Sequence, residues 1–381
     1  MNFEFTEEQI EFRKQIARYV DDRIVPRAEE LDETHEFPRD IMLELGELGY
    51  LGIKYPEAYG GSGLDEPHMV HTIFCEELAR GSLGVAAGIA MHTSTATYGV
   101  NKWGTEALKQ AYLVPALQGK KIAAFGLTEP GAGSDAGAVR TRAQRDGDHY
   151  VLNGTKIFTT NGTVADFITI AARTTPGKGF KGISLFLLDT KTPGFSVGRR
   201  LEKFTIQCSD TAELVLDNVR IPADCLLGEQ DMGLINIAQS LIDDRVMTAG
   251  LCIGVARAAY LAALKYSQER EQFGQPISKF QAVRFRLVDM LTRLKTAELY
   301  TYYAAWRADR GEKIVQEAAM AKLIASEGAN TICRQALSIF GGYGLMKEYP
   351  AQRFLRDSFF PLVGGGTSDI MKVVISKEMG I

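Results

Sequence analysis

The stretch LTEPGAGSD, residues 127–135, follows directly on a short apolar run, Ile122–Leu127, which has the pattern of a buried strand. A glycine-rich turn after a strand presents free backbone N–H groups that can hold an anion or a ring carbonyl. The stretch is neither GxGxxG nor a P-loop, because no GK[ST] follows it. Taken alone it also fits a plain loop, because any strand can end in glycines.

Residues 121–228, around this turn, alternate apolar and polar residues with the period of two that is typical of strands. Two hairpin turns are predicted, at Arg145–Asp148 and Asn153–Gly154. Further strands are expected at Phe167–Ala172, Ile183–Leu188, Ser196–Arg199 and Ala212–Val219. We therefore expect an all-β middle domain at 121–228.

Residues 1–120 and 229–381, on either side, have the 3.6-residue period of helices. Thr6 is expected to cap the first helix, and Pro38 to open the second. Helices are predicted at Glu7–Val20, Thr72–Ala79, Val85–Val100, Leu234–Arg270, Gln281–Asp309, Ile314–Phe340 and Ala351–Phe360. The fold class is thus α+β with segregated elements, rather than a doubly wound sheet.

Composition excludes several classes of protein. The 381 residues are 45% hydrophobic and 24% charged, as in a globular protein, and the net charge of −4 without a polybasic block argues against nucleic acid and anionic membranes. The apolar runs are too short to span a bilayer, and the first residues do not form a signal peptide. The five cysteines form no CxxC, so we expect no metal site, reduced thiols and a cytoplasmic location.

Four further motifs suggest a ligand with a flat ring and a diphosphate. Lys156–Gly162 (KIFTTNG) pairs an aromatic residue with hydroxyls, although an edge strand with a turn explains it equally simply. Arg270 lies where a helix ends before Gly274. Its guanidinium could bind a diphosphate through two hydrogen bonds, or it could simply interact with the helix dipole. Ile339–Gly344 and Val363–Ile370 put glycines at helix termini; the second is a candidate flavin cradle or a flexible hinge.

Together and in this order, the five motifs resemble the acyl-CoA dehydrogenase family of FAD flavoproteins. The resemblance covers the whole chain, and Leu201–Pro222 is also typical of that family. It implies an N-terminal helical domain (1–120), a middle β-barrel or β-sandwich domain (121–228) and a C-terminal four-helix bundle (229–381). It also implies a homotetramer that oxidises an acyl-CoA to the 2-enoyl-CoA and passes electrons to an electron-transfer flavoprotein.

The resemblance also implies which residues contact the FAD. For the ring and phosphates these are Phe125, Leu127, Thr128, Ser134, Phe158 and Thr160. For the diphosphate, ribose and adenosine they are Arg270, Phe273, Gln281, Gly341, Gly342, Thr367 and Asp369, the first three of them across a subunit contact. Many members have Gln at the adenine position where this chain has Ser338.

The catalytic base departs from the commonest family pattern. The reaction needs a carboxylate to remove the α proton while a hydride leaves the β carbon for flavin N5. The commonest members place a Glu where this chain has Gly365, whose backbone N–H can still donate to the thioester oxygen beside a flavin ribose hydroxyl. A branch that includes isovaleryl-CoA and long-chain dehydrogenases places Glu-Arg on the first helix of the C-terminal domain; here that pair is Asp244-Arg245.

The residue pattern independently favours Asp244 as the base. It interrupts a mostly apolar row of its helix, so burial should raise its pKa, whereas Asp243 lies on a more polar row. The alternatives are a buried ion pair of Asp244 with Arg245 or with a basic residue elsewhere, and His92 as the base, although a lone His on an apolar helix is more often structural. Substrate contacts are expected from Met91, His92, Ser134, Asp244, Arg245 and Gly366.

The three glycines Gly364–Gly366 indicate which kind of acyl group the substrate carries. Tyr and Glu are common at the first two positions in the family, so their loss should leave room for a branched, cyclic or aryl acyl group. Three other functions stay open: an enoyl-CoA reductase, a dehydrogenase of acyl groups on a carrier protein, and a flavin protein that binds nucleic acid. The net charge of −4 weighs against the last of these.

Overall fold

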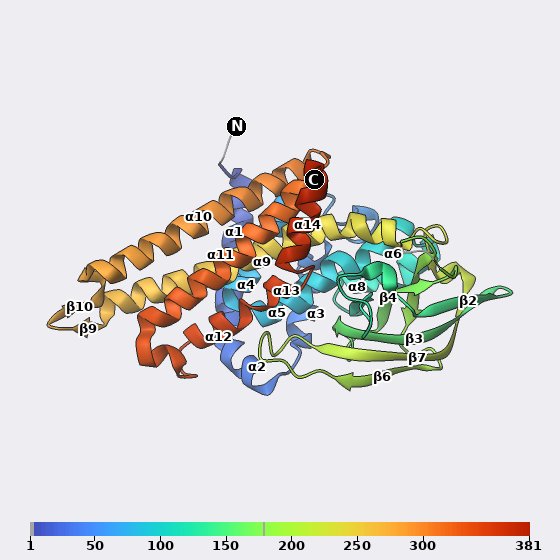
Figure 1. The fold of residues 1–381 in the computed structure, drawn as a ribbon, viewed down its shortest axis with the longest axis horizontal. Coiled ribbons are helices and arrows are strands. Elements are labelled where there is room, and N and C mark those ends of the chain that lie inside the picture. Colours follow the sequence, from blue (N-terminus) through green and yellow to red (C-terminus); the bar gives the residue numbers. More distant parts are fainter. Residues whose placement is uncertain (1–3, 178–179) are drawn as a thin grey trace.

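The β-sheet lies at one end of an elongated molecule, and three long helices run from it toward the other end (Figure 1). The computed structural model describes residues 4–177 and 180–381. Helices come first, then the strands of the sheet, then helices again, so the predicted class of segregated α and β elements is confirmed.

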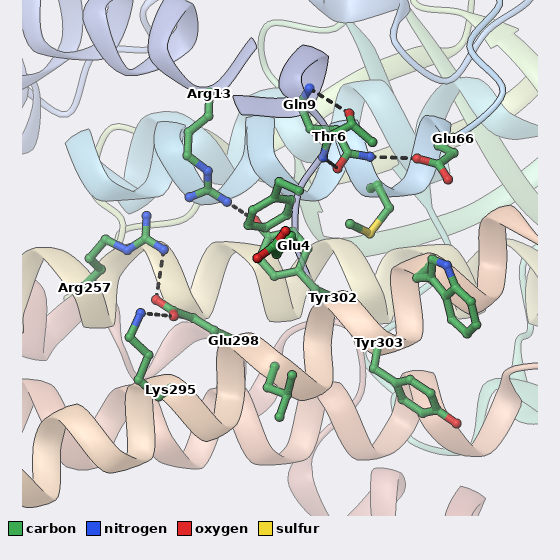
Figure 2. Close-up of a pocket in the computed structure, with 14 residues that line it drawn as sticks. Glu4, Thr6, Gln9, Arg13, Glu66, Arg257, Lys295, Glu298, Tyr302 and Tyr303 are labelled. Atoms are coloured by element: carbon green, nitrogen blue, oxygen red, sulfur yellow. Dashed lines mark hydrogen bonds and ion pairs between the residues drawn. The ribbon is translucent and has the colours of Figure 1, made fainter. Parts of the chain in front are cut away.

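The N-terminal helices pack around α4 and α5. As predicted, Thr6 caps the first helix: its side chain accepts from Gln9 N–H, and the Gln9 side chain accepts from Thr6 N–H (Figure 2). The α-helices are α1 (Glu7–Tyr19), α2 (Ala28–Thr34), α3 (Arg39–Glu47), α4 (Pro67–Gly81), α5 (Leu83–Met91), α6 (Thr97–Trp103), α7 (Glu106–Leu108) and α8 (Val114–Leu117). A π-helical turn, η5 (His92–Ala96), joins α5 to α6.

The sheet has eight strands in the order β6-β7-β3-β2-β4-β5-β8, with β1 pairing parallel to β4. The strands are β1 (Ala123–Gly126), β2 (Arg142–Asp146), β3 (His149–Thr160), β4 (Phe167–Arg173), β5 (Ile183–Asp189), β6 (Phe195–Arg200), β7 (Thr211–Pro222) and β8 (Leu226–Leu227). Strands β4 and β5 are almost wholly buried, which explains their continuous apolar runs.

One predicted hairpin turn is wrong. The turn at Arg145–Asp148 joins β2 to β3 as expected, but Asn153 and Gly154 lie inside β3 at a break in its register with β7. Gly154 has φ +153°, and a Cβ there would lie 2.4 Å from Thr141 Oγ1. The glycine therefore permits a bulge and the close approach of a neighbouring segment, not a chain reversal.

The C-terminal domain is built on α9 (Gly233–Glu269), which packs against α4, α10 and α11. By length and composition α9 could cross a membrane, but 72% of its most apolar window is buried inside the molecule, as in the core helix of a globular domain. The remaining elements are β9 (Glu271–Gln272), β10 (Gln275–Pro276), α10 (Gln281–Asp309), α11 (Val315–Phe340), α12 (Ala351–Asp357), α13 (Phe360–Val363) and α14 (Ser368–Met379).

Candidate active site

Helix α5 and the π-helical turn η5 connect the sheet to α9. The side chain of Asn161, just after β3, donates to Gly88 O on α5 (2.9 Å) and to Ala123 O at the start of β1 (3.3 Å). Four residues beyond the end of that helix, Thr95 donates a hydrogen bond to Asp244 on α9. The start of β1 and the end of β3 are therefore linked to Asp244 through the helical segment α5–η5.

The two motifs at the end of the sheet are locked to each other by a buried ion pair. Lys156 Nζ lies 2.7 Å from Glu129 Oε1 and also donates to Leu127 O at 3.1 Å. Glu129 accepts in addition from the backbone N–H groups of Arg140 and Thr141. The glycine-rich turn and the KIFTTNG segment thus form one surface with a fixed shape, and the sequence reasoning did not single out Lys156.

Asp244 is a buried carboxylate that accepts a hydrogen bond from Thr95. Its side chain is 2% exposed, and Thr95 Oγ1 lies 3.0 Å from its Oδ1. Burial raises the pKa of Asp244, and the Thr95 hydrogen bond and the charge of Arg245 offset this only in part. A carboxylate in this environment is a stronger proton acceptor than an exposed Asp, as a catalytic base requires.

Gly365 faces the other oxygen of this carboxylate. A Cβ on Gly365 would lie 3.1 Å from Asp244 Oδ2 and 3.5 Å from Thr248 Oγ1. Gly365 and Gly366 have φ of +66° and +97°, and Lys322 Nζ, fully buried on α11, donates to Gly366 O at 2.5 Å. Two positions more than a hundred residues apart thus converge at one point, and the family resemblance associates both of them with the catalytic base.

Asp243, the preceding residue, is bound quite differently. Its carboxylate lies 3.1 Å from Lys54 Nζ and 3.4 Å from His68 Nε2, and His68 Nδ1 lies 2.8 Å from Asp309. Burial alone would raise the pKa of Asp243, but the charge of Lys54 and the hydrogen bond to His68 hold it well below its usual range. Asp243 is therefore an ion-paired structural carboxylate.

Comparison with known proteins agrees with this geometry. Three family models match in order: the acyl-CoA dehydrogenase N-terminal domain at 6–120, the middle domain at 124–219 and the C-terminal domain at 231–380. The chain belongs to the acyl-CoA dehydrogenase family. Its sequence is 41% identical to a benzylmalonyl-CoA dehydrogenase of Aromatoleum aromaticum, with 100% of both chains covered. It is also 41% identical to a 3-(aryl)acrylate reductase of Clostridium sporogenes, over 98% of this chain and 99% of the relative.

The same family holds among solved structures. The butyryl-CoA dehydrogenase of Megasphaera elsdenii superposes with a TM-score of 0.96 at 38% identity, and all of both chains is covered. Membership of the acyl-CoA dehydrogenases implies a flavin cofactor. The surface at the ends of β1 and β3 fits one: Ile157 N–H donates to Thr128 O and so joins the two segments, and Phe158, at φ +56°, is 66% exposed. A flat ring there would meet an aromatic face and the hydroxyls of Thr128 and Thr160.

The predicted cofactor residues fall into two groups. Phe125, Leu127, Thr128, Ser134, Phe158 and Thr160 gather at the end of the sheet, and Thr367 caps α14 by accepting from Ile370 N–H, with Asp369 exposed in the first turn. Arg270, Phe273, Gln281, Ser338, Gly341 and Gly342 lie at the far tip of the bundle, near β9 and β10 (Figure 1). At 1.5 Å per residue, Arg270 is about 39 Å along α9 from Asp244.

His92, expected as a substrate contact and considered as an alternative base, has a structural role instead. It is fully buried; its Nε2 lies 3.0 Å from Ala116 O and its Nδ1 3.0 Å from Ala123 N, and burial lowers its pKa to about 4. Both ring nitrogens are used by the backbone, so His92 is neither a base nor a substrate contact but a structural link between η5 and β1. Met91, beside it, is half-buried at the end of α5.

Arg245 is buried without the ion pair that was considered for it. Among the described residues, its Nε has no hydrogen-bond partner, and no ion pair joins it to Asp244. Burial lowers its pKa, and its side chain is 8% exposed. Among the described residues, Asp244 and Arg245 therefore do not form the buried ion pair that was the alternative to a catalytic role for Asp244.

The triple glycine leaves less empty volume than the sequence predicted. A Cβ on Gly364 would lie 2.6 Å from the Phe360 ring, so Phe360 already fills the space beside that position. Room next to Asp244 comes from Gly365 alone. Sequence reasoning also missed Thr95 and Lys322, because a hydroxyl and a lysine within helical runs carry no pattern that points to a partner far along the chain.

Proposed function

We propose that this protein is a flavin-dependent acyl-CoA dehydrogenase in which Asp244 removes the α proton of an acyl thioester to give the 2-enoyl-CoA. The observation that carries the proposal is the buried carboxylate of Asp244, whose Oδ2 faces Gly365. Desolvation disfavours its charge, so transfer of the α proton to it is helped by the environment. The backbone N–H of Gly365 is the proposed donor to the thioester oxygen, where negative charge develops.

We propose FAD as the flavin. When bound, it supplies the acceptor for the hydride that leaves the β carbon. Leu127, Thr128, Phe158 and Thr160 would hold its ring, and the N-terminus of α14 at Thr367 would favour a negatively charged phosphate. The C–H bonds at the α and β carbons break and one C=C bond forms, so proton and hydride leave to Asp244 and to the cofactor respectively.

A homotetramer is proposed because the predicted diphosphate- and adenosine-binding residues of one chain lie at the far end of α9 from its own Asp244. Phe273, at the tip between β9 and β10, is 93% exposed, and α10 also exposes Phe285, Val288 and Leu299. Apolar side chains of this size in a row are typical of a surface that a second copy covers. Arg270, Phe273 and Gln281 would then reach the diphosphate and adenosine of a neighbouring subunit's FAD, and an electron-transfer flavoprotein is the proposed acceptor.

The proposed substrate carries a branched, cyclic or aryl acyl group. Gly365 opens space beside Asp244, and the benzylmalonyl-CoA and arylacrylate relatives are named for aryl compounds. The test is anaerobic titration of the purified protein with butyryl-, octanoyl-, isovaleryl-, cyclohexanecarboxyl- and 3-phenylpropionyl-CoA, with flavin bleaching as the readout. We expect bleaching, strongest with the last three; a preference for octanoyl-CoA would overturn the acyl assignment, and colourless protein that takes up no FAD would overturn the function.

A second candidate is the reverse reaction, reduction of an enoyl-CoA. The observation in its favour is the 41% identity to an arylacrylate reductase. Chemically reduced protein mixed with cinnamoyl-CoA should be reoxidised quickly if this is the working direction. A reoxidation rate far below the rate of bleaching by 3-phenylpropionyl-CoA would instead support dehydrogenation.

A further inference from the structure

The π-helical turn η5 carries Thr93 and Thr95, and Thr97 follows it at the start of α6; their hydroxyls point to different partners. Thr93 Oγ1 donates to Ala90 O and meets His71, and Thr97 Oγ1 donates to His92 O. Thr97 Oγ1 also lies 2.5 Å from the hydroxyl of Tyr55. Thr95 Oγ1 instead donates to Asp244 Oδ1 on α9 at 3.0 Å. A π-helical turn is rare and is frequently found at functional sites.

The Thr95 bond divides the two oxygens of Asp244 between two tasks. Oδ1 accepts the hydrogen bond from Thr95, and Oδ2 faces Gly365, where a Cβ would lie 3.1 Å away. We propose that Thr95 is a positioning residue, which fixes the rotation of the Asp244 carboxylate and so aims Oδ2 at the α carbon of the thioester. This inference rests on the proposed role of Asp244 as the base.

The charged groups around Asp244 do not supply an alternative anchor. Arg245, Lys54 and Lys322 act on the carboxylate only through their charge, and Cys75 is the other titratable group that feels it. Lys54 is bound to Asp243 and Lys322 to Gly366. Within residues 4–177 and 180–381, Thr95 is the one residue that donates a hydrogen bond to the Asp244 side chain.

The bond also affects when the base is charged. A hydrogen bond to the ionised form favours that form, so the Thr95 hydroxyl opposes the rise in the pKa of Asp244 that burial causes. Loss of the hydroxyl should therefore do two things at once. It should free the carboxylate to rotate, and it should move the acid limb of the pH profile to higher pH.

The experiment compares Thr95→Val, which keeps the shape, with Thr95→Ser, which keeps the hydroxyl. With an acyl-CoA that bleaches the flavin, Thr95→Val should lower kcat about 10- to 100-fold with KM changed less than about 3-fold, and shift the acid limb upward. Thr95→Ser should stay within about 3-fold of wild type. A second readout is wash-out of deuterium from the substrate α carbon into water, followed by mass spectrometry, which reports proton removal without flavin reduction.

The matched control is Thr93→Val, the same change in the same turn but on a hydroxyl that faces His71. It should leave the pH profile in place. If Thr95→Val does not fold, judged by flavin content and Tm, Thr95→Ala against Thr95→Ser gives the same comparison. An unshifted acid limb and unchanged deuterium wash-out in Thr95→Val or Thr95→Ala would overturn the role of Thr95. Asp244→Asn separates the two proposals: full wash-out in that variant overturns the base itself, whereas its loss beside a normal Thr95 variant overturns only the positioning.

Discussion

Asp243 and Asp244 are neighbours on α9, yet the molecule treats them in opposite ways. Asp243 faces Lys54 and His68, which bind both of its oxygens and depress its pKa. Asp244 faces Thr95 and Gly365, and burial raises its pKa. Because one step along a helix turns the side chain by 100°, adjacent residues point toward different elements. The surroundings, and not the residue type, separate a structural carboxylate from a proposed base.

The largest expected effect comes from removing the carboxylate of Asp244. Asp244→Asn keeps the size of the side chain and an oxygen for Thr95 but cannot accept the α proton. We expect flavin reduction by an acyl-CoA to slow about 10³-fold or more, as for loss of a general base. Stopped-flow bleaching at 450 nm would measure it. Retention of more than about a tenth of the wild-type rate would contradict the role of Asp244 as the base.

Asp243→Asn should affect stability rather than chemistry. It leaves Lys54, which is 9% exposed, without its partner, and breaking one side of such a pair costs about 3 kcal/mol. Because the folded pKa of Asp243 is depressed, its contribution to stability is present at neutral pH and lost as the pH falls through the acidic range. Urea unfolding of Asp243→Asn and wild type should therefore converge toward low pH. Equal stability at pH 7 would contradict the pairing.

Gly365→Ala tests the close approach of Gly365 to the Asp244 carboxylate. Alanine places a Cβ 3.1 Å from Asp244 Oδ2 at φ +66°, which an L residue adopts at a cost of about 1–2 kcal/mol. We expect flavin bleaching to slow about 30-fold, through crowding where the α carbon must sit. Gly147→Ala, in the turn between β2 and β3, is the control: its φ of +63° is similar, a Cβ there would meet no atom within 4 Å, and it should bleach at the wild-type rate.

The smallest effect is a gain in stability on replacing the proposed base. The folded pKa of Asp244 is raised, so its stabilising contribution is present only at acid pH and is lost as the pH rises through the folded pKa. Asp244→Asn should thus have a Tm roughly 2 °C above wild type at pH 8, with the difference vanishing toward pH 4. The opposite signs expected for the two Asp→Asn variants at neutral pH are the sharpest form of the comparison; a lower Tm for both would remove it.

Local signals predicted most of the fold. The capping box at Thr6, the bounds of α10 and the order of helices and strands follow from caps and periodicity, which act over a few residues. Asn153–Gly154 misled because the same dipeptide permits either a turn or a bulge, and only the packing of Thr141 decides between them. The helix predicted over Ala351–Phe360 divides into α12 and α13, with Pro361 in the first turn of the second.

The site was predictable only where a motif or a helical row carried it. Asp244 could be singled out because it breaks an apolar row, and the glycines near the C-terminus because they cluster. The partners Thr95, Lys54 and Lys322 come from segments far away in the chain, and their roles depend on tertiary distances that periodicity does not contain. His92 looked reactive because of its residue type, whereas its two backbone partners make it inert.

The close approach of Gly365 to Asp244 also limits how such a site can change over generations. With 3.1 Å between one oxygen and the place of a new Cβ, a second acidic side chain at 365 would crowd two negative charges into one dry pocket. A lineage that relocates its carboxylate between these two places must therefore shrink one residue as it enlarges the other. A lineage that replaced one residue before the other would have had a poor base or none in between. We therefore expect the two replacements to have occurred together.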